Sequence, residues 1–390
     1  MRQLRLVLIT RRFWPLVGGA EMTMANLAAA LCEAGHTVTI LTAAWNPDWP
    51  MEIQHRGVRV TRIGQTSLRF FGTWRYMRGI RRWLKAHRGE YDLVYVSMLK
   101  HDAYAAVGAG RKLGFPVALR AEGGGLTGDA AWQRNERFGK WIRRRCRLAD
   151  AIVAPSPAIQ QELAASAYDV DRLHVIASGV SVWPERSPQT RMEAREALAG
   201  AHAVLSLGRD TKLAVFTGRL ALEKGLMSLV DAWARVLKSR SNTRLWLVGE
   251  GPIRDKLAAE IERLQIRGRC VLVGSFDCVE EVLAAADVFV LPSREEGMSI
   301  ALLEAMASGL PIVATDIPGN RALIASGEHG LLVPPDDPAA LAGAINSLLD
   351  APSRAAHYGE AARGRVERHF ALSTMVGRHV DLFERCLNKQ

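Results

Sequence analysis

The chain has 390 residues, of which 48% are hydrophobic, so it is long enough for two or three domains with buried cores. Its apolar runs all fall short of the roughly 18–20 residues that a membrane span needs, and the run after Met1–Arg5 is too short for a signal peptide. The five cysteines are scattered without the spacing of a zinc site or a disulfide framework, which favours a reduced, cytoplasmic setting.

The net charge of +11 is unevenly distributed along the chain. Residues 1–150 contain 25 Lys and Arg against 11 Asp and Glu, whereas residues 151–390 contain 26 against 29. A basic first part of this kind indicates a polyanionic partner, either a membrane surface or a nucleic acid.

The first half alternates strand-like runs with helical patterns. Because many of the runs are continuously apolar, as in parallel strands buried on both faces, they predict a doubly wound α/β sheet. The expected strands are Leu4–Thr10, Thr37–Thr42, Val58–Ile63, Leu93–Met98, Val117–Arg120, Ala151–Pro155 and Leu173–Ala177. The expected helices are Ala20–Ala34, Trp74–His87, Asp102–Leu113, Ala130–Leu148 and Ala158–Ser166.

A polar segment with two prolines, Trp183–Thr190, predicts a linker, and a second βα series follows it. Its expected strands are Leu213–Thr217, Arg244–Val248, Val271–Val273, Val288–Leu291, Ile312–Thr315 and Leu331–Val333. Its expected helices include Leu226–Leu237, Ile253–Leu264, Val279–Ala285, Ile300–Ala307, Pro338–Leu349, Ser353–His369 and Thr374–Leu387. Two doubly wound domains that face each other would leave a cleft, the natural place for a ligand.

Two carboxylates, Glu296 and Glu304, frame the start of an apolar helix that follows the strand at Val288–Leu291. Ser299 is expected to cap this helix, and ligands of open α/β sheets bind at the carboxyl ends of the strands. N–H groups at the helix start favour an anion, and a carboxylate such as Glu304 can accept hydrogen bonds from two vicinal hydroxyls. Phosphates together with a diol indicate a nucleotide, although surface glutamates beside an ordinary amphipathic helix would show the same spacing.

Arg219 and Lys224 lie in a glycine-containing loop directly after the strand at Leu213–Thr217. The fork of an arginine and the point charge of a lysine both suit a diphosphate, although two solvated surface cations would look the same in isolation. Gly249-Glu250-Gly251 forms a further strand-end turn. Because the carboxyl ends of parallel strands share one edge of a sheet, we expect these loops and the two glutamates to converge.

Gly18 and Gly19 occupy the turn between the first strand and the first helix, where glycine lets the backbone approach a ligand closely. The turn does not read GxGxxG, so a Rossmann dinucleotide site is not supported, and a simple turn is the alternative.

Taken in order, these motifs resemble the signature of the retaining nucleotide-sugar glycosyltransferases of family 4, which have the two-domain GT-B architecture. The resemblance is carried by Gly218-Arg219-Leu220, Lys224-Gly225, Val248–Pro252, Ala286–Val288, Pro292-Ser293, Glu296-Gly297, Glu304–Ala307, Gly309 and Pro311–Thr315. In the first half it rests more loosely on Gly18-Gly19 and Ala154–Ser156.

The resemblance implies an acceptor-side domain at residues 1–183 and a donor-binding domain at residues 184–370, with residues 371–390 packing back on the first. Arg219 and Lys224 would hold the donor diphosphate and stabilise the leaving group. Glu296 would contact hydroxyls of the transferred sugar, and Glu304 would hold the ribose. The other implied donor contacts are Gly18, Gly19, Gly249, Gly251, Ser275, Gly297, Met298 and Ser299.

The chain departs from the family pattern after its fifth strand, where a histidine near the transferred sugar is frequent. The segment here reads Arg120-Ala121-Glu122-Gly123, so Arg120 or Glu122 would face the acceptor instead. His101 is a further candidate on the acceptor side, although a histidine at a helix start is more often a cap or a surface residue.

No cofactor is expected besides the donor, a UDP- or GDP-linked sugar, and no essential metal. Positive potential from Arg219, Lys224 and a helix N-terminus would stabilise the negative charge that grows on the departing diphosphate. Asp169-Val170-Asp171 has the form that metal-using transferases employ, but we interpret it as a turn, far in sequence from these cations.

The segment Trp74–Arg88 combines a basic stripe with an apolar stripe, which is typical of a helix at the surface of an anionic membrane. A second basic and aromatic run spans Arg134–Arg147. The alternative is two ordinary amphipathic helices whose aromatic side chains belong to the core. The candidate membrane contacts are Trp74, Arg75, Arg78, Arg82, Trp83 and Lys85.

The sequence thus predicts a cytoplasmic enzyme, peripheral on the inner face of the plasma membrane, that moves a hexose with retention from a nucleotide sugar to a hydroxyl of a lipid-linked acceptor or growing glycan. The alternatives are a sugar epimerase or sugar-phosphate synthase of the same architecture, and a non-catalytic module that binds a membrane or a nucleic acid. No nucleic-acid partner is expected, because lipid headgroups account for the positive charge.

Overall fold

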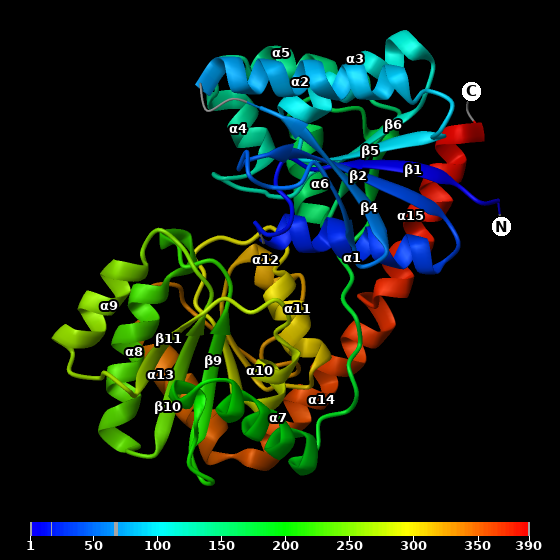
Figure 1. The fold of residues 1–390 in the computed structure, drawn as a ribbon. Coiled ribbons are helices and arrows are strands. Elements are labelled where there is room, and N and C mark those ends of the chain that lie inside the picture. Colours follow the sequence, from blue (N-terminus) through cyan, green and yellow to red (C-terminus); the bar gives the residue numbers. More distant parts are fainter. Residues whose placement is uncertain (1, 17, 66–68, 389–390) are drawn as a thin grey trace. The chain divides into compact units, whose positions relative to one another are not determined.

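The computed structural model describes residues 2–16, 18–65 and 69–388. The chain divides into two compact units (Figure 1): unit 1 comprises Met1–Gly179 and Leu372–Gln390, and unit 2 comprises Val180–Ala371. The boundary lies at Gly179, four residues before the boundary that the sequence predicts after Trp183. Both units are parallel-sheet α/β structures, which confirms the predicted fold class.

Unit 1 contains an eight-stranded sheet of order β3-β4-β2-β1-β5-β6-β7-β8, in which only the edge pair β3–β4 is antiparallel among the described strands. The strands are β1 (Arg5–Ile9), β2 (Thr37–Ala44), β3 (Glu52–His55), β4 (Val58–Gly64), β5 (Leu93–Ser97), β6 (Val117–Arg120), β7 (Ala151–Ala154) and β8 (Leu173–Val175). The helices are α1 (Gly19–Glu33), α2 (Arg69–Ala86), α3 (His101–Leu113), α4 (Asp129–Asn135), α5 (Gly139–Cys146), α6 (Pro157–Ala165) and α15 (Leu372–Asn388).

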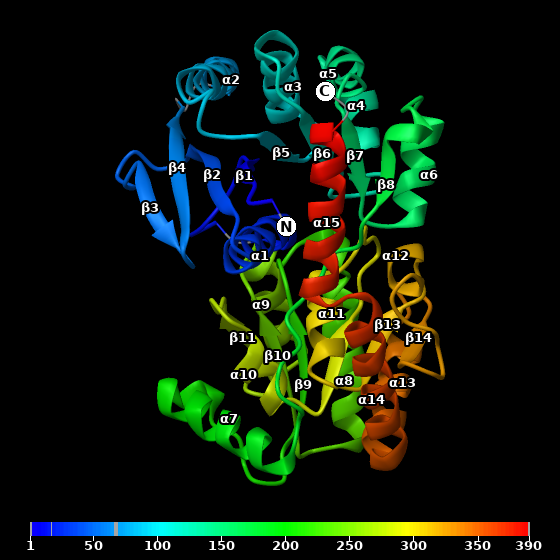
Figure 2. The same cartoon turned by 90° about the vertical axis from the view of Figure 1, so that its right-hand side faces the viewer.

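Two apolar cores lie on the two faces of this sheet. One core joins inward residues of α2, α3 and α5 to the strands, with Ile80, Ala106 and Ile142 as examples. The other joins α1 to α15 through residues such as Leu27 and Phe383. Figure 2 shows α2, α3 and α5 side by side along one side of the sheet, with α1 and α15 on the other.

The final helix α15 is held on unit 1 by a buried polar contact as well as by its apolar face. The Tyr95 hydroxyl lies 2.9 Å from Nε2 of His379, whose Nδ1 lies 2.8 Å from the Met375 carbonyl oxygen. Burial lowers the pKa of His379 to about 3, so the ring is neutral. A carbonyl can only accept, so Nδ1 carries the proton and Nε2 accepts from Tyr95.

Two elements of unit 1 differ from the sequence prediction, and one predicted turn is present. The strand β3 was not predicted because a short polar strand at a sheet edge shows no apolar run. The single helix expected over Ala130–Leu148 is two helices, since Gly139 packs against the Gln133 carbonyl so closely that a Cβ there would collide with it. The Asp169–Asp171 segment is a turn, as predicted, with the Asp169 carboxylate accepting from the Asp171 N–H at 3.1 Å.

Unit 2 contains a six-stranded parallel sheet of order β11-β10-β9-β12-β13-β14. The strands are β9 (Lys212–Thr217), β10 (Thr243–Val248), β11 (Cys270–Gly274), β12 (Val288–Leu291), β13 (Ile312–Thr315) and β14 (Leu331–Val333). The helices are α7 (Pro188–Ala201), α8 (Leu226–Ser239), α9 (Arg254–Arg263), α10 (Glu280–Ala285), α11 (Ile300–Ala307), α12 (Pro318–Arg321), α13 (Pro338–Asp350) and α14 (Pro352–His369).

The helix α7 begins inside the segment that the sequence analysis assigned to a linker. Ser187 and Thr190 form a capping box at its start, with proline at the first helical position. Arg191 and Arg195 then bind the Asp287 carboxylate at 2.7 and 2.9 Å, so ion pairs tie this helix to the sheet of unit 2.

The strand order of unit 2 reverses between β9 and β12, because the chain proceeds outward from β9 to β11 and then returns to the other side of β9. In open parallel sheets a ligand crevice forms at such a switch point, outside the carboxyl ends of the strands. The loops that follow β9 and β12 are the two that carry the predicted cations and carboxylates.

Candidate functional site

Four strand-end loops of unit 2 touch one another through glycine. A Cβ at Gly249, after β10, would collide with the carbonyl oxygen of Gly218, after β9. A Cβ at Gly225 would collide with the Pro292 oxygen after β12, and one at Gly319 with the Glu296 oxygen. Gly218, Gly225 and Gly249 also have positive φ, which favours glycine. At these three glycines, therefore, the backbones of neighbouring loops are in direct contact around the predicted site.

Lys224 and Glu296, which the sequence placed in separate loops, form an ion pair. The Lys224 Nζ donates to the Glu296 Oε1 at 2.7 Å, and both side chains are largely buried. The Ser293 hydroxyl donates to the same oxygen at 2.6 Å. The carboxylate thus sets the position of the ammonium group, and the serine sets the position of the carboxylate.

Arg219 is exposed and lies in the same loop as Lys224. No ion pair or hydrogen bond of its guanidinium group occurs within the described part of the chain. Its five N–H donors are therefore available to an anion at the β9–β12 switch point.

Glu304 projects from the second turn of α11 and is only partly exposed. Burial raises the pKa of its carboxyl group to about 7. Across residues 2–16, 18–65 and 69–388, no side-chain donor pairs with this carboxylate. A partly buried carboxylate without a protein donor is suited to a ligand that brings hydroxyl donors.

The helix α11 begins where the sequence predicted. The Ser299 hydroxyl accepts the Leu302 N–H at 3.3 Å, which is the expected N-cap bond. Gly297, Met298 and Ser299 lead into the first turn, whose backbone N–H groups lack carbonyl partners inside a helix. This end of α11 lies beside the Lys224–Glu296 pair because Glu296 immediately precedes Gly297.

Gly249, Gly251 and Ser275 lie at the neighbouring strand ends. The Gly249 N–H donates to the Gly274 carbonyl at 2.7 Å, which joins the loop after β10 to the segment that leads to Ser275. A Cβ at Gly251 would collide with the Leu220 carbonyl, next to Arg219. The structure thus brings the unit 2 candidates to one edge of one sheet.

Three residues that support the site were not named as site residues from the sequence. Ser293 positions Glu296, the Thr315 hydroxyl donates to the Ser293 carbonyl, and Gly319 lies against the Glu296 backbone. Ser293 stands three residues before Glu296, directly after a buried strand, and Gly319 follows Pro318 after another. The sequence signal that could have identified these residues is a polar residue or a glycine at the end of a buried strand.

The acceptor-side candidates of unit 1 are engaged with one another. Arg120 is fully buried, and its guanidinium group donates to the Ile176 carbonyl, the Ser178 hydroxyl and the Glu122 carboxylate. Glu122 also accepts from the Ser97 hydroxyl at 2.9 Å. Burial raises the pKa of Glu122 to about 7, although Arg120 opposes this change.

His101 is largely enclosed as well. Its ring meets that of Trp132 edge to face at 5.3 Å between centroids. Burial, with help from Arg11 and Lys100, lowers its pKa to about 4. Gly18 and Gly19 lie at the start of α1, as predicted, with Gly18 as the N-cap residue.

The predicted membrane contacts on α2 divide into two groups. Trp74, Arg75, Arg78, Arg82 and Lys85 are exposed. Trp83 instead packs against the core and stacks on His87 at 4.1 Å between ring centroids, so it does not belong to the exposed face. The sequence pattern could not separate the two tryptophans because both border the apolar stripe.

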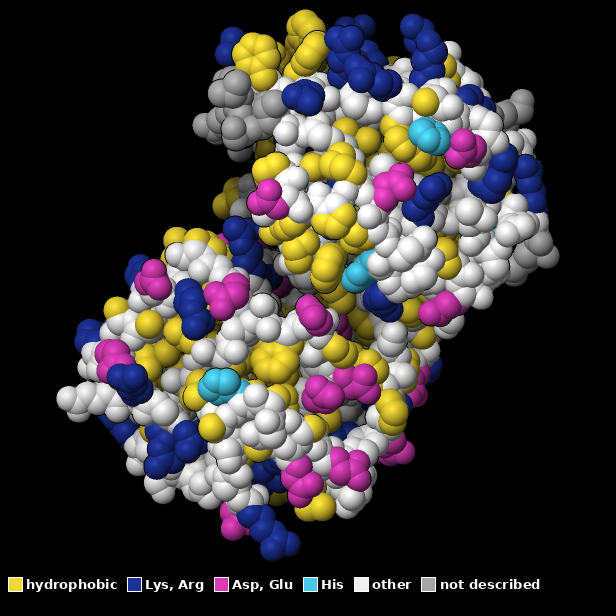
Figure 3. Space-filling model, viewed as in Figure 1, with side chains coloured by type: hydrophobic (Ala, Val, Ile, Leu, Met, Phe, Trp, Pro, Cys, Tyr) yellow, Lys and Arg dark blue, Asp and Glu magenta, His cyan; other side chains and the backbone are white. Residues whose placement is uncertain are grey.

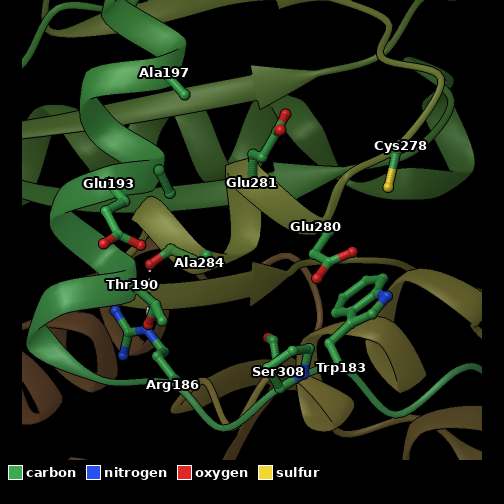
Figure 4. Close-up of a pocket in the computed structure, with 12 residues that line it drawn as sticks. Trp183, Arg186, Thr190, Glu193, Ala197, Cys278, Glu280, Glu281, Ala284 and Ser308 are labelled. Atoms are coloured by element: carbon green, nitrogen blue, oxygen red, sulfur yellow. Dashed lines mark hydrogen bonds between the residues drawn. The ribbon is translucent and has the colours of Figure 1, made fainter.

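A separate hollow of about 440 Å³ lies between α7 and α10 (Figure 4). Trp183 and Glu280 lie side by side at one end, and Arg186, Thr190 and Glu193 lie at the other. None of the predicted donor residues lines it.

Two kinds of feature are absent from the described residues. No group of three or more His, Cys, Asp or Glu side chains is arranged to hold a metal ion. No helix there combines the length and apolar character that crossing a membrane requires.

Comparison with known proteins agrees with this architecture. A family model described as Glycosyl transferases group 1 matches residues 211–351, and one described as Glycosyltransferase Family 4 matches residues 17–183. A GDP-mannose-dependent alpha-mannosyltransferase from Mycolicibacterium smegmatis is 30% identical over 384 residues, which cover 93% of this chain and 92% of that protein.

Two solved structures share the fold over the whole chain. Sucrose-phosphate synthase from Thermosynechococcus elongatus superimposes with a TM-score of 0.80 at 24% identity, covering 100% of both chains. HepE from Anabaena, solved in complex with UDP and glucose, also gives 0.80, at 19% identity, covering 98% of this chain and 100% of that one.

Two doubly wound units, with cations and carboxylates gathered at a strand-end switch point, define a glycosyltransferase of the GT-B class. Within that class the chain belongs to the group 1, family 4 glycosyltransferases, and it is an enzyme of the transferase type.

Proposed function

We propose that the enzyme transfers a hexosyl group, with retention at the anomeric carbon, from a nucleotide-diphosphate sugar to a hydroxyl acceptor. The observation that carries this proposal is the Lys224–Glu296 pair at the β9–β12 switch point, with Arg219 in the loop of Lys224 and Glu304 on the helix that follows Glu296. Two cations suit a diphosphate, and a carboxylate without a donor suits the hydroxyls of a ribose.

The chemistry assigned to these residues follows from where charge develops. When the sugar–phosphate bond breaks, negative charge grows on the departing diphosphate, and Arg219, Lys224 and the first turn of α11 supply positive potential there. Glu296 keeps Lys224 in place and offers an acceptor for sugar hydroxyls. In same-face attack the acceptor oxygen bonds to the anomeric carbon, and its proton passes to an oxygen of the leaving diphosphate.

The base is proposed to lie at the Gly249–Gly251 turn and Ser275, and the diphosphate at Arg219 and Lys224. Two similar proteins support a UDP or GDP donor, since one was solved with UDP and glucose and the other uses GDP-mannose by its name. The resemblance adds Gly18 and Gly19 of unit 1 to the donor contacts.

The acceptor is proposed to be a lipid-linked or growing glycan at an anionic, cytoplasmic membrane face. The exposed aromatic and basic side chains of α2 support this placement, since such a surface is suited to the interface of an acidic bilayer.

The direct test is a panel of UDP- and GDP-linked hexoses in a thermal-shift assay, because a ligand that binds only the folded state raises its stability. We expect one nucleotide sugar to stabilise the wild type and to stabilise a Glu304→Ala variant much less. A panel without any effect, or an equal shift for both proteins, contradicts the donor site. NMR of the product then reports the anomeric configuration.

A second candidate is synthesis of a sugar phosphate, since one of the structural neighbours is a sucrose-phosphate synthase. Product analysis separates the candidates: a hexose 6-phosphate acceptor in solution would be consumed by a synthase and left unchanged by an enzyme that needs a membrane glycan.

A further inference from the structure

Three neighbouring helices of unit 1, α2, α3 and α5, form a surface of one charge. Their described side chains include eleven Lys and Arg against a single carboxylate, Asp102. Asp102 is buried and lies 3.5 Å from the Tyr76 hydroxyl, so it does not offset the surface charge. By contrast, α1 on the opposite face of the same sheet contains two glutamates and no cation. The helix α15 on that face contains two arginines balanced by Asp381 and Glu384, so the net positive charge is concentrated on the face of α2, α3 and α5.

At the centre of this surface two arginines from different helices approach one aromatic ring. The guanidinium carbon of Arg145, on α5, lies 4.6 Å from the ring centroid of Tyr104, on α3. That of Arg81, on α2, lies 5.6 Å from the same centroid. No carboxylate pairs with either arginine in the part of the chain that the structure describes. Two like charges held over one ring repel each other unless an anion lies between them.

Gly108 supplies the space for this arrangement. It lies one helical turn after Tyr104, and a Cβ there would collide with Nη1 of Arg145 and lie 3.9 Å from Nη2 of Arg81. A glycine in the middle of a helix costs about 1 kcal/mol relative to alanine. The two guanidinium groups therefore face the same small space above a residue that has no side chain. We call Arg81, Tyr104, Gly108 and Arg145 the arginine notch.

Apolar side chains flank the notch on the same helices. Phe71 and Trp74 on α2 are 70% and 55% exposed, and Trp141 on α5 is 73% exposed. In the space-filling view, dark blue basic and yellow apolar side chains lie together along this edge of unit 1 (Figure 3). Exposed aromatic side chains beside arginines are typical of surfaces that enter the headgroup region of a bilayer.

We propose that the arginine notch binds the phosphate of an anionic membrane lipid, while Phe71, Trp74 and Trp141 enter the bilayer interface around it. Guanidinium groups bind phosphate oxygens through paired N–H donors, and two of them match the two free oxygens of a phosphodiester. This inference rests on the membrane part of the proposed function and names the group by which the membrane is recognised.

A lipid is favoured over a nucleic acid because two exposed aromatic rings in the basic part of unit 1 already have an arginine over one face. Arg78 lies over the Trp74 ring at 5.4 Å, and Arg137 lies over the Phe138 ring at 5.4 Å. A base would have to displace these arginines in order to stack. Insertion of a ring edge into lipid leaves them in place.

The test is sedimentation of the full chain with phosphatidylcholine vesicles that contain or lack 30% phosphatidylglycerol. The variant Arg81→Gln with Arg145→Gln removes the notch, and the matched control Arg75→Gln with Arg144→Gln removes one exposed arginine from each of the same helices. We expect the notch variant to bind acidic vesicles at least fivefold more weakly than the control. Equal losses would mean that the charge acts diffusely, and the notch would be refuted.

A second variant changes no charge. Gly108→Ala places a methyl group where the Arg145 guanidinium lies, and it also favours the helix. We expect at least a threefold loss of vesicle binding with an unchanged or higher melting temperature. Unchanged vesicle binding would overturn the proposal, and a lowered melting temperature would refute the assignment of Gly108 to the notch.

Two further titrations test whether the phosphate that binds the notch belongs to a lipid, a small soluble molecule or a nucleic acid. Glycerol phosphate in solution and a single-stranded oligonucleotide are each titrated against the wild type and the notch variant. The proposal expects weak binding of both relative to acidic vesicles. If either ligand bound more tightly than acidic vesicles, and lost this binding in the notch variant, the lipid proposal would be refuted. Hydrolysis of the nucleotide sugar in solution should be the same in all these variants. A failure of the lipid proposal is therefore distinguishable from a failure of the proposed donor site.

Discussion

The strand-end edges of the two units use charged residues in opposite ways. In unit 1, Arg120 and Glu122 are buried and bonded to each other and to neighbouring polar groups. In unit 2, Lys224 and Glu296 are paired, but Arg219 and Glu304 have no partner among the described residues. Buried charges that satisfy each other avoid the cost of an unpaired buried charge, whereas charges held without a partner are suited to a ligand.

This difference changes what the acceptor-side candidates can do. Arg120 was predicted to face the acceptor, yet its donors are directed to Ile176, Ser178 and Glu122. It holds the segment after β8 on the end of β6, just before the chain leaves unit 1. The comparison therefore distinguishes a stabilising network in unit 1 from a binding site in unit 2. Four substitutions test this distinction.

The largest effect is expected from Arg120→Met. The change leaves Glu122 buried without its cation, which typically costs about 3–5 kcal/mol of stability. Urea unfolding measures the loss, and the double variant Arg120→Met with Glu122→Leu should recover part of it because no buried charge remains. If Arg120→Met unfolds like the wild type but loses turnover, the residue acts on the acceptor and the comparison is wrong.

Lys224→Ala should lower the turnover number by about 10²–10³-fold, the usual cost of removing a donor aimed at developing negative charge. The matched control is Lys256→Ala, which removes an exposed cation from α9 of the same unit. Steady-state kinetics with the donor identified in the thermal-shift panel measure both. A loss below fivefold for Lys224→Ala excludes a leaving-group role.

Glu304→Gln should weaken donor binding about tenfold or more, because a charged acceptor contributes about 1.5–3 kcal/mol in a hydrogen bond. Without donor the same change should stabilise the protein at alkaline pH. Burial raises the pKa of Glu304 to about 7, so its contribution to stability is full at pH 4 and is lost as the pH rises through 7.

Glutamine cannot ionise, so Glu304→Gln should melt about 2–5 °C above the wild type at pH 8 and at the same temperature near pH 4. Calorimetry in the two buffers measures this difference. Identical melting at pH 8 would show that the carboxylate carries no burial penalty.

The smallest effect is expected from Ser299→Ala, which removes the N-cap of α11. Loss of the bond to the Leu302 N–H should cost about 1 kcal/mol, and Ser299→Asp should retain most of the stability. Melting temperatures report both. If alanine and aspartate behave alike, the hydroxyl does not cap the helix.

Much of unit 2 follows from local patterns. Continuous apolar runs marked β9, β10, β12 and β13, and residues at their ends marked the site, because parallel strands share one edge. The roles of Arg219, Lys224, Glu296 and Glu304 stay predictions, but their placement at one edge is observed.

Other features depended on contacts that sequence periodicity does not report. The strand β3 pairs at an edge without an apolar run, and α7 is held by ion pairs to Asp287, far along the chain. Trp83 and Trp74 are alike in sequence, yet one packs on the core and the other is exposed.

The sequence by itself determined the two α/β units, the strand-end residues of the proposed donor site and the basic character of the first part. Only the tertiary structure decided which charges are satisfied and which remain available, such as Arg120 against Arg219, and it alone joined Arg81 to Arg145. The physical reason is that periodicity records which face of an element is buried, whereas the partners of a charged side chain depend on the elements that fold against it.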